Sequence, residues 1–283
     1  MADPAEVSVV IPAVNEEAGI GAVVEGLRAC AAWRELLVVD DGSSDRTAER
    51  AQAAGARVVR HPYNKGNGAA LKTGIRAAEG AVVLLLDADG QHDPADALRL
   101  VAPVGLHDMV IGARSARDQS ATRALGNWVF TTLASWLTSR PIPDLTCGFR
   151  AARRVPLLDV LPLLPNGFSA PTSSCLAFLK AGYNVSFEPV RARARVGRSK
   201  IRPLRDGVRF LLIILKIVTL YSPLKVFFPI AAAAFALGTA YGAWNVIAQG
   251  KIPMGAALLI QLAVVVFLFG LISEQIASTQ DRK

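Results

Sequence analysis

The feature that most constrains this chain is a pair of long uncharged stretches near its C-terminus. Residues 226–248 and 252–273 contain no Asp, Glu, Lys, Arg or His, and only residues 249–251 separate them. At about 1.5 Å per helical residue, each stretch spans roughly 33 Å, which is enough to cross a hydrocarbon core of about 30 Å. The spacing predicts a two-helix transmembrane hairpin within residues 225–283, with both ends on one side of the bilayer.

The basic charge of the chain is concentrated just before this hairpin. Residues 191–209 hold eight Arg or Lys residues against one acidic residue, a net charge of +7 out of +8 for the whole chain. By the positive-inside rule, this predicts a multi-pass protein whose preceding domain and both termini are cytoplasmic. This basic run either associates with an anionic membrane surface or binds a phosphate-bearing substrate, and one stretch can do both. Residues 207–224 predict an interfacial amphipathic helix.

The composition leaves room for one water-soluble domain, over residues 1–206. Hydrophobic residues make up 52% of the chain and charged residues only 19%, against about 25% charged in an ordinary soluble protein. The N-terminal residues lack a basic segment followed by an apolar run, so no secretory signal is expected. The three cysteines are far apart in sequence and predict reduced thiols rather than a zinc site. The basic run adjoins a membrane segment and has no interleaved aromatic residues, which argues against a nucleic acid partner.

Short apolar runs alternate with helix-like segments through this first domain. The expected strands are 7–11, 36–39, 58–60, 82–86, 109–111 and 185–191, and helices are expected over 128–136 and 172–180. Such alternation predicts an α/β fold, Rossmann-like, with a mostly parallel sheet covered by helices on both faces. Ligands then bind at the carboxyl ends of the strands.

Two of the expected strands end in polar turns. Pro12 is expected to end the first strand and Asn15 to cap the helix that follows it. The second strand runs into Asp40 and Asp41, and a carboxylate at a strand end can accept a hydrogen bond from a base or a ribose hydroxyl. Each motif is common, so neither assigns a function by itself.

The fourth expected strand ends in two carboxylates that are one residue apart. Three leucines lead directly into Asp87, Ala88 and Asp89, with Gln91 two residues further on. Burying two carboxylates together is costly unless a cation neutralises them. Hard oxygen ligands of this kind suit Mg²⁺ or Mn²⁺ bridging the diphosphate of a substrate. The alternative is a solvated acidic turn.

Taken together and in this order, the motifs resemble a known family. VIPAVNEE, VVDDGSSD, NKGNGAALKTGI and LLLDADGQHDP look like the GT-A nucleotide-sugar transferases of glycosyltransferase family 2. The later DLTCGFRA (residues 144–151) and GRSK (197–200), followed by a hairpin, resemble its dolichol-phosphate mannose synthase branch and related polyprenyl-phosphate glycosyltransferases. The resemblance covers about residues 7–225.

The resemblance implies a set of donor-binding residues. Pro12, Val14, Glu16, Asp41, Asp87, Ala88, Asp89 and Gln91 match nucleotide-sugar contacts, and Asp89 and Gln91 are the expected ligands of a divalent metal, Mg²⁺ or Mn²⁺. The family usually has an aromatic residue where Val14 stands, so stacking on the nucleotide is not implied there. Lys65 is either a further phosphate contact or a solvated lysine.

The resemblance also implies an acceptor site and catalytic groups. Arg114, Arg123, Arg195 and Lys200 match residues that contact the acceptor phosphate, with Arg193 a rival to Arg195. Asp89, Arg114 and Asp144 are the catalytic candidates, where Asp144 either orients the sugar, assists as a base, or forms a structural cap or ion pair. The expected acceptor is a polyprenyl or dolichyl monophosphate, and the expected donor GDP-mannose or a UDP-hexose.

The expected reaction inverts the anomeric configuration in one displacement, because the acceptor phosphate is already an anion and needs little base assistance. Two other functions stay open: a family 2 transferase with a polysaccharide or protein-linked acceptor, and a membrane-tethered nucleotide-sugar binder without activity. Only two predicted membrane helices follow the domain, too few for an evident polymer channel. Whether the chain forms a homo-oligomer is left open.

Overall fold

The computed structural model describes residues 2–114, 128, 131–136, 138–167, 170–191 and 223–280 of the chain. The chain divides into two compact units, Met1–Leu211 and Leu212–Lys283. The first is an α/β domain and the second contains the C-terminal helices, and each is described by itself.

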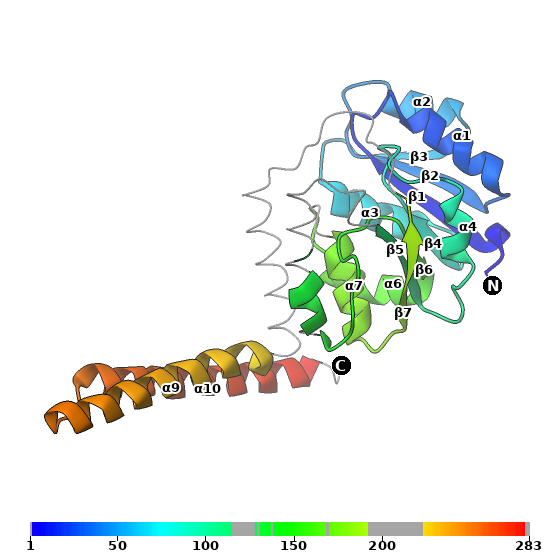
Figure 1. Cartoon of the computed structure of the whole chain (residues 1–283). Coiled ribbons are helices and arrows are strands. Elements are labelled where there is room, and N and C mark those ends of the chain that lie inside the picture. The colour runs from blue at the N-terminus through cyan, green and yellow to red at the C-terminus, as the bar shows by residue number, and fades with distance from the viewer. Residues whose placement is uncertain are drawn as a thin grey trace. The chain divides into compact units, whose positions relative to one another are not determined.

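The first unit is built on a seven-stranded sheet with the order β3-β2-β1-β4-β6-β5-β7 (Figure 1). The strands are β1 (Val7–Ala13), β2 (Glu35–Asp40), β3 (Arg57–Arg60), β4 (Val82–Leu85), β5 (Met109–Arg114), β6 (Arg150–Arg153) and β7 (Val185–Val190). Every residue of β1 and β4 is buried, as expected for central strands covered on both faces. The predicted α/β architecture is confirmed.

One strand, β6, runs against the others and was not predicted. It pairs antiparallel with β4, with Leu85 opposite Arg150, and antiparallel with β5, with Ile111 opposite Arg150. Its first residue therefore lies at the edge where β4 and β5 end. The loop that leads into β6 reaches the same edge as the turns that follow the parallel strands.

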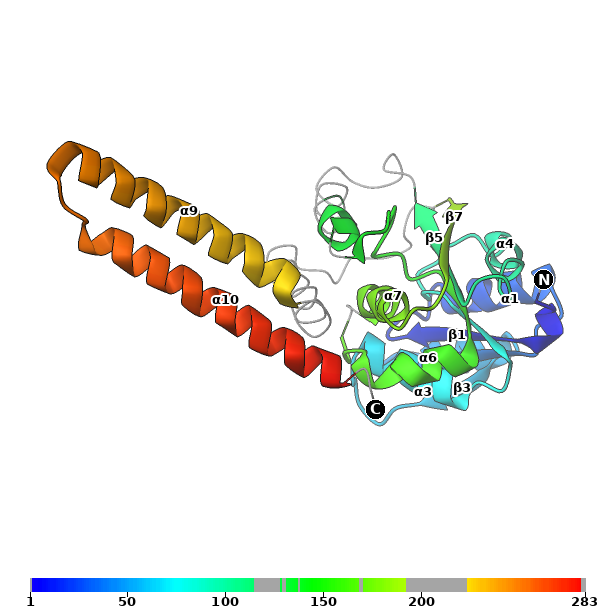
Figure 2. The same ribbon diagram turned by 90° about the horizontal axis from the view of Figure 1, so that it is seen from below.

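Helices cover both faces of this sheet. They are α1 (Ile20–Cys30), α2 (Thr47–Ala53), α3 (Asn67–Ala77), α4 (Asp96–Val101), α6 (Arg154–Val160) and α7 (Ala170–Lys180), with short 3-10 turns at Pro4–Glu6 and Leu161–Leu163. Figure 2 shows α1 and α4 on one side of the sheet and α3 and α6 on the other. Gly74 of α3 lies directly against Val10 and Val39, because a Cβ there would meet Val10 Cγ1 at 2.3 Å.

Pro12 does not end the first strand, contrary to the sequence prediction. It lies within β1, opposite Val39 of β2. The β1–β4 ladder ends at Val10, whose carbonyl accepts the amide of Leu86. Backbone groups two residues apart in a strand point to the same side, so the missing N–H of Pro12 faces the side where β4 has already ended.

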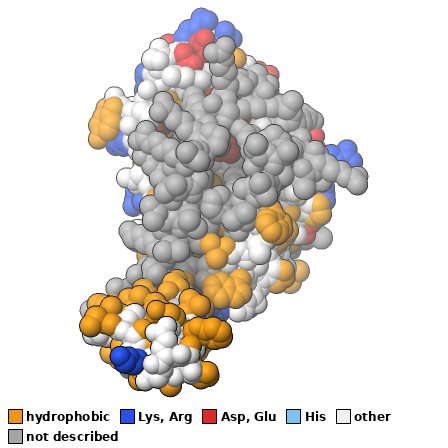
Figure 3. Space-filling view, turned by 60° about the vertical axis from the view of Figure 1, so that its left-hand side comes forward, with side chains coloured by type: hydrophobic (Ala, Val, Ile, Leu, Met, Phe, Trp, Pro, Cys, Tyr) orange, Lys and Arg blue, Asp and Glu red, His pale blue; other side chains and the backbone are white. Residues whose placement is uncertain are grey.

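The second unit is a hairpin of two long apolar helices, α9 (Pro223–Gln249) and α10 (Met254–Gln280). Both helices are long and apolar enough to cross a membrane, with mean hydropathies of 1.6 and 2.6. Large hydrophobic side chains are exposed along them, among them Trp244 and Phe269, and hydrophobic side chains are prominent on the face of the hairpin seen in Figure 3. The first uncharged stretch therefore lies wholly within α9, and the second lies within α10 from residue 254 onward.

Candidate active site

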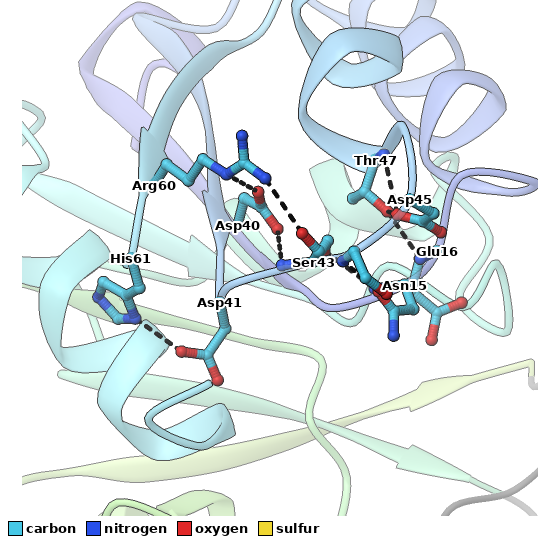
Figure 4. A network of polar contacts seen from close by, with 10 residues as sticks. Asn15, Glu16, Asp40, Asp41, Ser43, Asp45, Thr47, Arg60 and His61 are labelled. Atoms are coloured by element: carbon cyan, nitrogen blue, oxygen red, sulfur yellow. Dashed lines mark hydrogen bonds and ion pairs between the residues drawn. The ribbon is translucent and has the colours of Figure 1, made fainter. Parts of the chain in front are cut away.

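The loop after β1 is fastened to the loop after β2 by reciprocal hydrogen bonds (Figure 4). Ser43 Oγ accepts the backbone amide of Asn15 at 3.0 Å, and Asn15 Oδ1 accepts the amide of Ser44 at 2.9 Å. Asn15 has a φ of 53°, a conformation that Asn tolerates better than most residues. Asn15 therefore does not cap α1 as predicted, because that helix begins only at Ile20, after Gly19.

The same two loops are joined again one residue further along. Thr47 Oγ1 accepts the amide of Glu16 at 2.9 Å, and Asp45 Oδ2 accepts the amide of Glu17 at 3.3 Å. Val14, half-buried, directly follows β1. The predicted nucleotide-contacting segment after β1 is therefore fixed by its backbone, which holds it at the carboxyl edge of the sheet.

The two carboxylates at the end of β2 have different surroundings. Asp40 is fully buried, accepts the amide of Ser43 at 3.0 Å and lies 3.1 Å from Nε of Arg60. Arg60 Nη2 also donates to the carbonyl of Ser43 at 3.0 Å. Asp40 therefore stabilises the turn after β2.

Asp41 accepts three hydrogen bonds from the segment between β3 and α3. Its Oδ1 lies 2.6 Å from Nδ1 of His61 and accepts the amide of Lys65 at 2.9 Å, and its Oδ2 accepts the amide of Gly66 at 2.8 Å. The residue is only 2% exposed. The ammonium group of Lys65 lies 5.6 Å from the ring centroid of Tyr63. The predicted base-reading carboxylate is thus also a support for the turn that opens α3.

The acidic loop after β4 offers oxygen ligands suitable for a divalent cation. Asp89 is buried and its Oδ1 accepts the amide of Gln91 at 3.1 Å, while Ala88 between the carboxylates is buried. The Asp87 side chain is 43% exposed and its Oδ2 lies 3.9 Å from Nε2 of His92. Carboxylate and amide oxygens are the donors that Mg²⁺ and Mn²⁺ prefer.

No three His, Cys, Asp or Glu residues within the described ranges form a group that could hold a metal ion. A cation at this loop would therefore take only some of its ligands from the described acidic side chains. The rest would come from the Gln91 amide, a substrate diphosphate and water, as is common for Mg²⁺. On that basis the loop fits a metal that is shared with a substrate.

Arg114 and Asp144 form a buried, two-pronged ion pair at the end of β5. Arg114 Nε donates to Asp144 Oδ2 at 2.8 Å, and Arg114 Nη2 donates to Asp144 Oδ1 at 3.1 Å and to Thr146 Oγ1 at 2.8 Å. The Asp144 side chain is fully buried and that of Arg114 is 20% exposed. Although burial opposes ionisation, the hydrogen bonds and charge of Arg114 hold the pKa of Asp144 below its usual value and raise the pKa of Arg114.

The loop between Asp144 and β6 packs directly against the acidic loop. A Cβ on Gly148 would lie 2.6 Å from Oδ2 of Asp87, so a larger residue there would have to displace that carboxylate. Arg150, 1% exposed, donates to the carbonyls of Cys147 and Pro171. Gly148 belongs to the DLTCGFRA motif, but its contact with Asp87 could not be seen before the antiparallel direction of β6 was known.

The structure therefore brings most of the predicted donor-site and catalytic residues to one edge of the sheet. Pro12, Val14, Glu16, Asp41, Asp87, Ala88, Asp89, Gln91, Arg114 and Asp144 all lie at or just beyond the carboxyl ends of β1, β2, β4 and β5, or in the loop entering β6. Arg123, Arg193, Arg195, Lys200 and residues 207–222 of the predicted interfacial helix lie outside the described residues. His61, Thr146 and Gly148 were not predicted.

Comparison with known protein families assigns the domain that contains this edge. The model of the family Glycosyl transferase family 2 matches residues 8–161. The chain belongs to this family. A second model, the GtrB C-terminal hairpin, matches residues 222–279, which together with the two apolar helices indicates a membrane protein and confirms the predicted hairpin.

Named relatives of this family 2 chain come from archaea and bacteria. A dolichyl-phosphate hexose transferase of Haloferax volcanii is 32% identical over 71% of this chain and 89% of its own length. An undecaprenyl-phosphate 4-deoxy-4-formamido-L-arabinose transferase of Pectobacterium carotovorum is 35% identical over 60% of this chain and 58% of its own length. The chain spans 64% of an uncharacterized protein of Methanocaldococcus jannaschii, to which it is 36% identical over 52% of its own residues.

Solved structures of similar fold support the same assignment. A glucosyl-3-phosphoglycerate synthase of Mycobacterium tuberculosis superposes with a TM-score of 0.61 at 25% identity, over 75% of this chain and 79% of that one. The same enzyme in complex with Mn²⁺, uridine diphosphate and glucosyl-3-phosphoglycerate superposes with a TM-score of 0.59 at 25% identity, with the same coverage. The predicted family and the predicted GT-A fold are confirmed.

Proposed function

We propose that this chain is a membrane-bound, inverting glycosyltransferase that moves a sugar from a nucleotide diphosphate sugar to a polyprenyl or dolichyl monophosphate. One observation carries the proposal. The acidic loop Asp87–Gln91 and the Arg114–Asp144 pair meet at one edge of the sheet, in a chain whose residues 222–279 match the GtrB C-terminal hairpin. The names of the relatives in Haloferax and Pectobacterium support a polyprenyl-phosphate acceptor.

The donor is expected to lie across the ends of β1, β2 and β4. In this arrangement Asp41 would accept a hydrogen bond from the base, while Asp89 and Gln91 would hold a divalent metal. When bound, such a cation stabilises negative charge on the departing diphosphate. The Mn²⁺ and uridine diphosphate in the similar mycobacterial synthase support a divalent metal. The carboxylate of Asp87, which lies close to Gly148, belongs to the same group of residues.

The acceptor is expected to supply its own nucleophile. A phosphate monoester is an anion with a second pKa of about 6, so one of its oxygens can form the bond to the anomeric carbon as the bond to the diphosphate breaks. The carboxylate of Asp144 is held by Arg114 and its pKa lies below the usual value, which makes it a poor proton acceptor at neutral pH. A single displacement then inverts the configuration.

Basic side chains are expected to place the acceptor phosphate opposite the nucleotide-sugar donor. None of the described hydrogen bonds of Arg114 uses Nη1, and guanidinium groups suit phosphate oxygens. Arg123, Arg195 and Lys200 of the predicted acceptor site would complete the binding of this phosphate. The net charge of +7 in residues 191–209 favours an anionic membrane surface and a cytoplasmic orientation of the catalytic domain.

A transfer assay on the full-length chain tests the proposal. Purified protein in nanodiscs is given a panel of radiolabelled nucleotide sugars with undecaprenyl or dolichyl phosphate and Mg²⁺ or Mn²⁺, and the lipid is extracted. We expect label in the organic phase with at least one donor and an inverted anomeric configuration by NMR. Asp89→Ala should abolish transfer, whereas Asp159→Asn, a change at an exposed carboxylate of α6, should not.

The outcomes separate the alternatives. Nucleotide binding without any labelled lipid would favour a membrane-tethered binder, and label on a polysaccharide or protein would favour another family 2 acceptor. A retained configuration would contradict the single displacement. Unimpaired transfer by Asp89→Ala would contradict the role of that residue in metal binding.

A further inference from the structure

A chain of hydrogen bonds, buried at Asp41 and part-buried at Thr73, joins the end of β2 to the side of α3 through one histidine. His61 follows β3, and its Nδ1 lies 2.6 Å from Oδ1 of Asp41, while its Nε2 lies 2.9 Å from Oγ1 of Thr73. The histidine is 5% exposed. Its own backbone amide donates to the carbonyl of Asp40 at 2.8 Å. Figure 4 shows the ring of His61 directed at Asp41.

The partners of the ring determine where its proton lies. A carboxylate oxygen accepts, so Nδ1 carries hydrogen towards Asp41, and in the neutral ring Nε2 is left to accept the hydroxyl hydrogen of Thr73. Both ring nitrogens are then occupied. The ring cannot turn without losing one hydrogen bond to a charged partner and one to a hydroxyl, so His61 and Thr73 fix the orientation of the carboxylate.

The carboxylate of Asp41 has one acceptor position left. A carboxylate offers about four lone-pair sites on its two oxygens. His61 and the amide of Lys65 use both sites of Oδ1, and the amide of Gly66 uses one site of Oδ2. None of the described hydrogen bonds uses the second site of Oδ2.

We propose that His61 and Thr73 are positioning residues that determine how this enzyme discriminates between nucleotide bases. They hold Asp41 so that the second site of Oδ2 faces a donor N–H on the base. The inference rests on the proposed nucleotide-sugar donor and on the base contact of Asp41. It adds two residues that need not touch the substrate themselves.

The same chain couples base recognition to the turn that opens α3. Gly66 has a φ of 102°, and a Cβ there would lie 2.4 Å from the carbonyl oxygen of Asn166, so this turn has little freedom of its own. The backbone amides of Lys65 and Gly66 in this turn donate to Asp41. Asp41 in turn contacts His61, and His61 contacts Thr73 of α3. Loss of the Thr73 hydroxyl therefore loosens the carboxylate and the turn together.

Three variants of the full-length chain in nanodiscs test the inference. Thr73→Val removes the hydroxyl at nearly constant shape, Thr73→Ser keeps it, and His61→Asn keeps a donor for Asp41 but is too short to reach Thr73. Thr138→Val is the control, because it removes a hydroxyl bonded to the carbonyl of Ala134 at 2.8 Å on another helix.

The measurements are the affinities for GDP, UDP, ADP and CDP by calorimetry, and kcat and KM for the sugar donor. We expect Thr73→Val and His61→Asn to weaken the preferred nucleotide about fivefold, as for the loss of one hydrogen bond. The least preferred nucleotide should change less than twofold, so discrimination falls, and KM should rise while kcat stays within twofold. Thr73→Ser and Thr138→Val should resemble the wild-type protein.

A merely structural role would lower the melting temperature and reduce kcat and all four affinities together, which would overturn the inference. Unchanged discrimination in both Thr73→Val and His61→Asn would also overturn it, as would failure of Thr73→Ser to restore the wild-type pattern. Asp41→Asn separates this inference from the proposed function. If Asp41→Asn leaves base preference intact, the base contact itself is wrong; if only Asp41→Asn changes it, the positioning role alone is wrong.

Discussion

The Arg114–Asp144 pair allows the sharpest test of the candidate site, through the change Arg114→Met. The methionine side chain fills similar space but removes the only cation that forms a salt bridge with Asp144 among the described residues. Asp144 is fully buried, so its charge would remain in the protein interior with hydrogen bonds from Thr146 and from the backbone amide of residue 114 but without a cation. The pKa of Asp144, now held below its usual value by Arg114, should rise.

The expected loss of folding stability depends on how deeply each partner of the ion pair is buried. Removing one partner of a buried ion pair costs about 3–5 kcal/mol, and 1 kcal/mol shifts the melting temperature of a domain of this size by about 2–4 °C. Arg114→Met should therefore lower the melting temperature by roughly 6–20 °C. Asp144→Asn should cost less, because the Arg114 side chain is 20% exposed and can be hydrated.

The assay is thermal unfolding of the full-length chain in detergent, followed by intrinsic fluorescence. Arg153→Met is the matched control, because Arg153 pairs with Asp108 at 3.0 Å while its own side chain is 54% exposed, and such a surface pair contributes about 0–1 kcal/mol. The double variant Arg114→Met with Asp144→Asn should recover most of the loss. A shift for Arg114→Met no larger than the control, or no recovery in the double variant, would refute the reasoning.

Three further predictions follow from the same edge of the sheet. Because the folded pKa of Asp144 is depressed, the stabilisation by its partner is present above the unfolded-state pKa of about 4 and is lost as the pH falls through the folded pKa. The difference in melting temperature between the wild-type protein and Arg114→Met should be largest near pH 8 and should narrow as the pH falls, because the raised pKa of Asp144 in the variant lets that carboxyl protonate first. Gly148→Ala should displace Asp87 and weaken Mn²⁺-dependent nucleotide binding measured by calorimetry, whereas Gly21→Ala, with nothing within 4 Å of the new Cβ, should leave binding unchanged. Burial raises the pKa of Cys147 to about 11 and that of Cys175 to about 12, so neither thiol should react with iodoacetamide at pH 8 until the chain is unfolded, as mass spectrometry can show.

The fold could be predicted where burial alone determines structure. β1, β2 and β4 are apolar runs buried on both faces, and their sequence pattern is sufficient to place them. β6 has the sequence Arg-Ala-Ala-Arg and contains no apolar run, so only its pairing with β4 and β5 makes it a strand. Pro12 lies inside β1, although a proline in an apolar run predicts a strand end, because β4 ends early and makes the missing N–H harmless. That early end is a tertiary feature, which the sequence does not show.

The site could be predicted only as far as topology determines it. Parallel strands bring their carboxyl ends to one edge, which is why Asp41, Asp87 and Asp89 could be grouped from the sequence. The partner of each carboxylate depends on loop conformation instead. Asp144 lies 30 residues after Arg114, and their two-pronged contact requires the antiparallel entry of β6 beside β5, which the strand pattern did not predict.

The state of Asp144 also bears on which acceptor this edge can serve. A sugar or protein hydroxyl needs a base to take its proton, and an efficient base has a pKa near the working pH. Arg114 instead holds the pKa of Asp144 below its usual value. The carboxylate of Asp144 therefore stabilises the loop and the guanidinium group but is poorly suited to accept a proton. A phosphate acceptor needs no such base, and it brings negative charge towards an arginine that still has donors to offer. The ion pair therefore favours a phosphate acceptor over a hydroxyl, independently of the apolar hairpin.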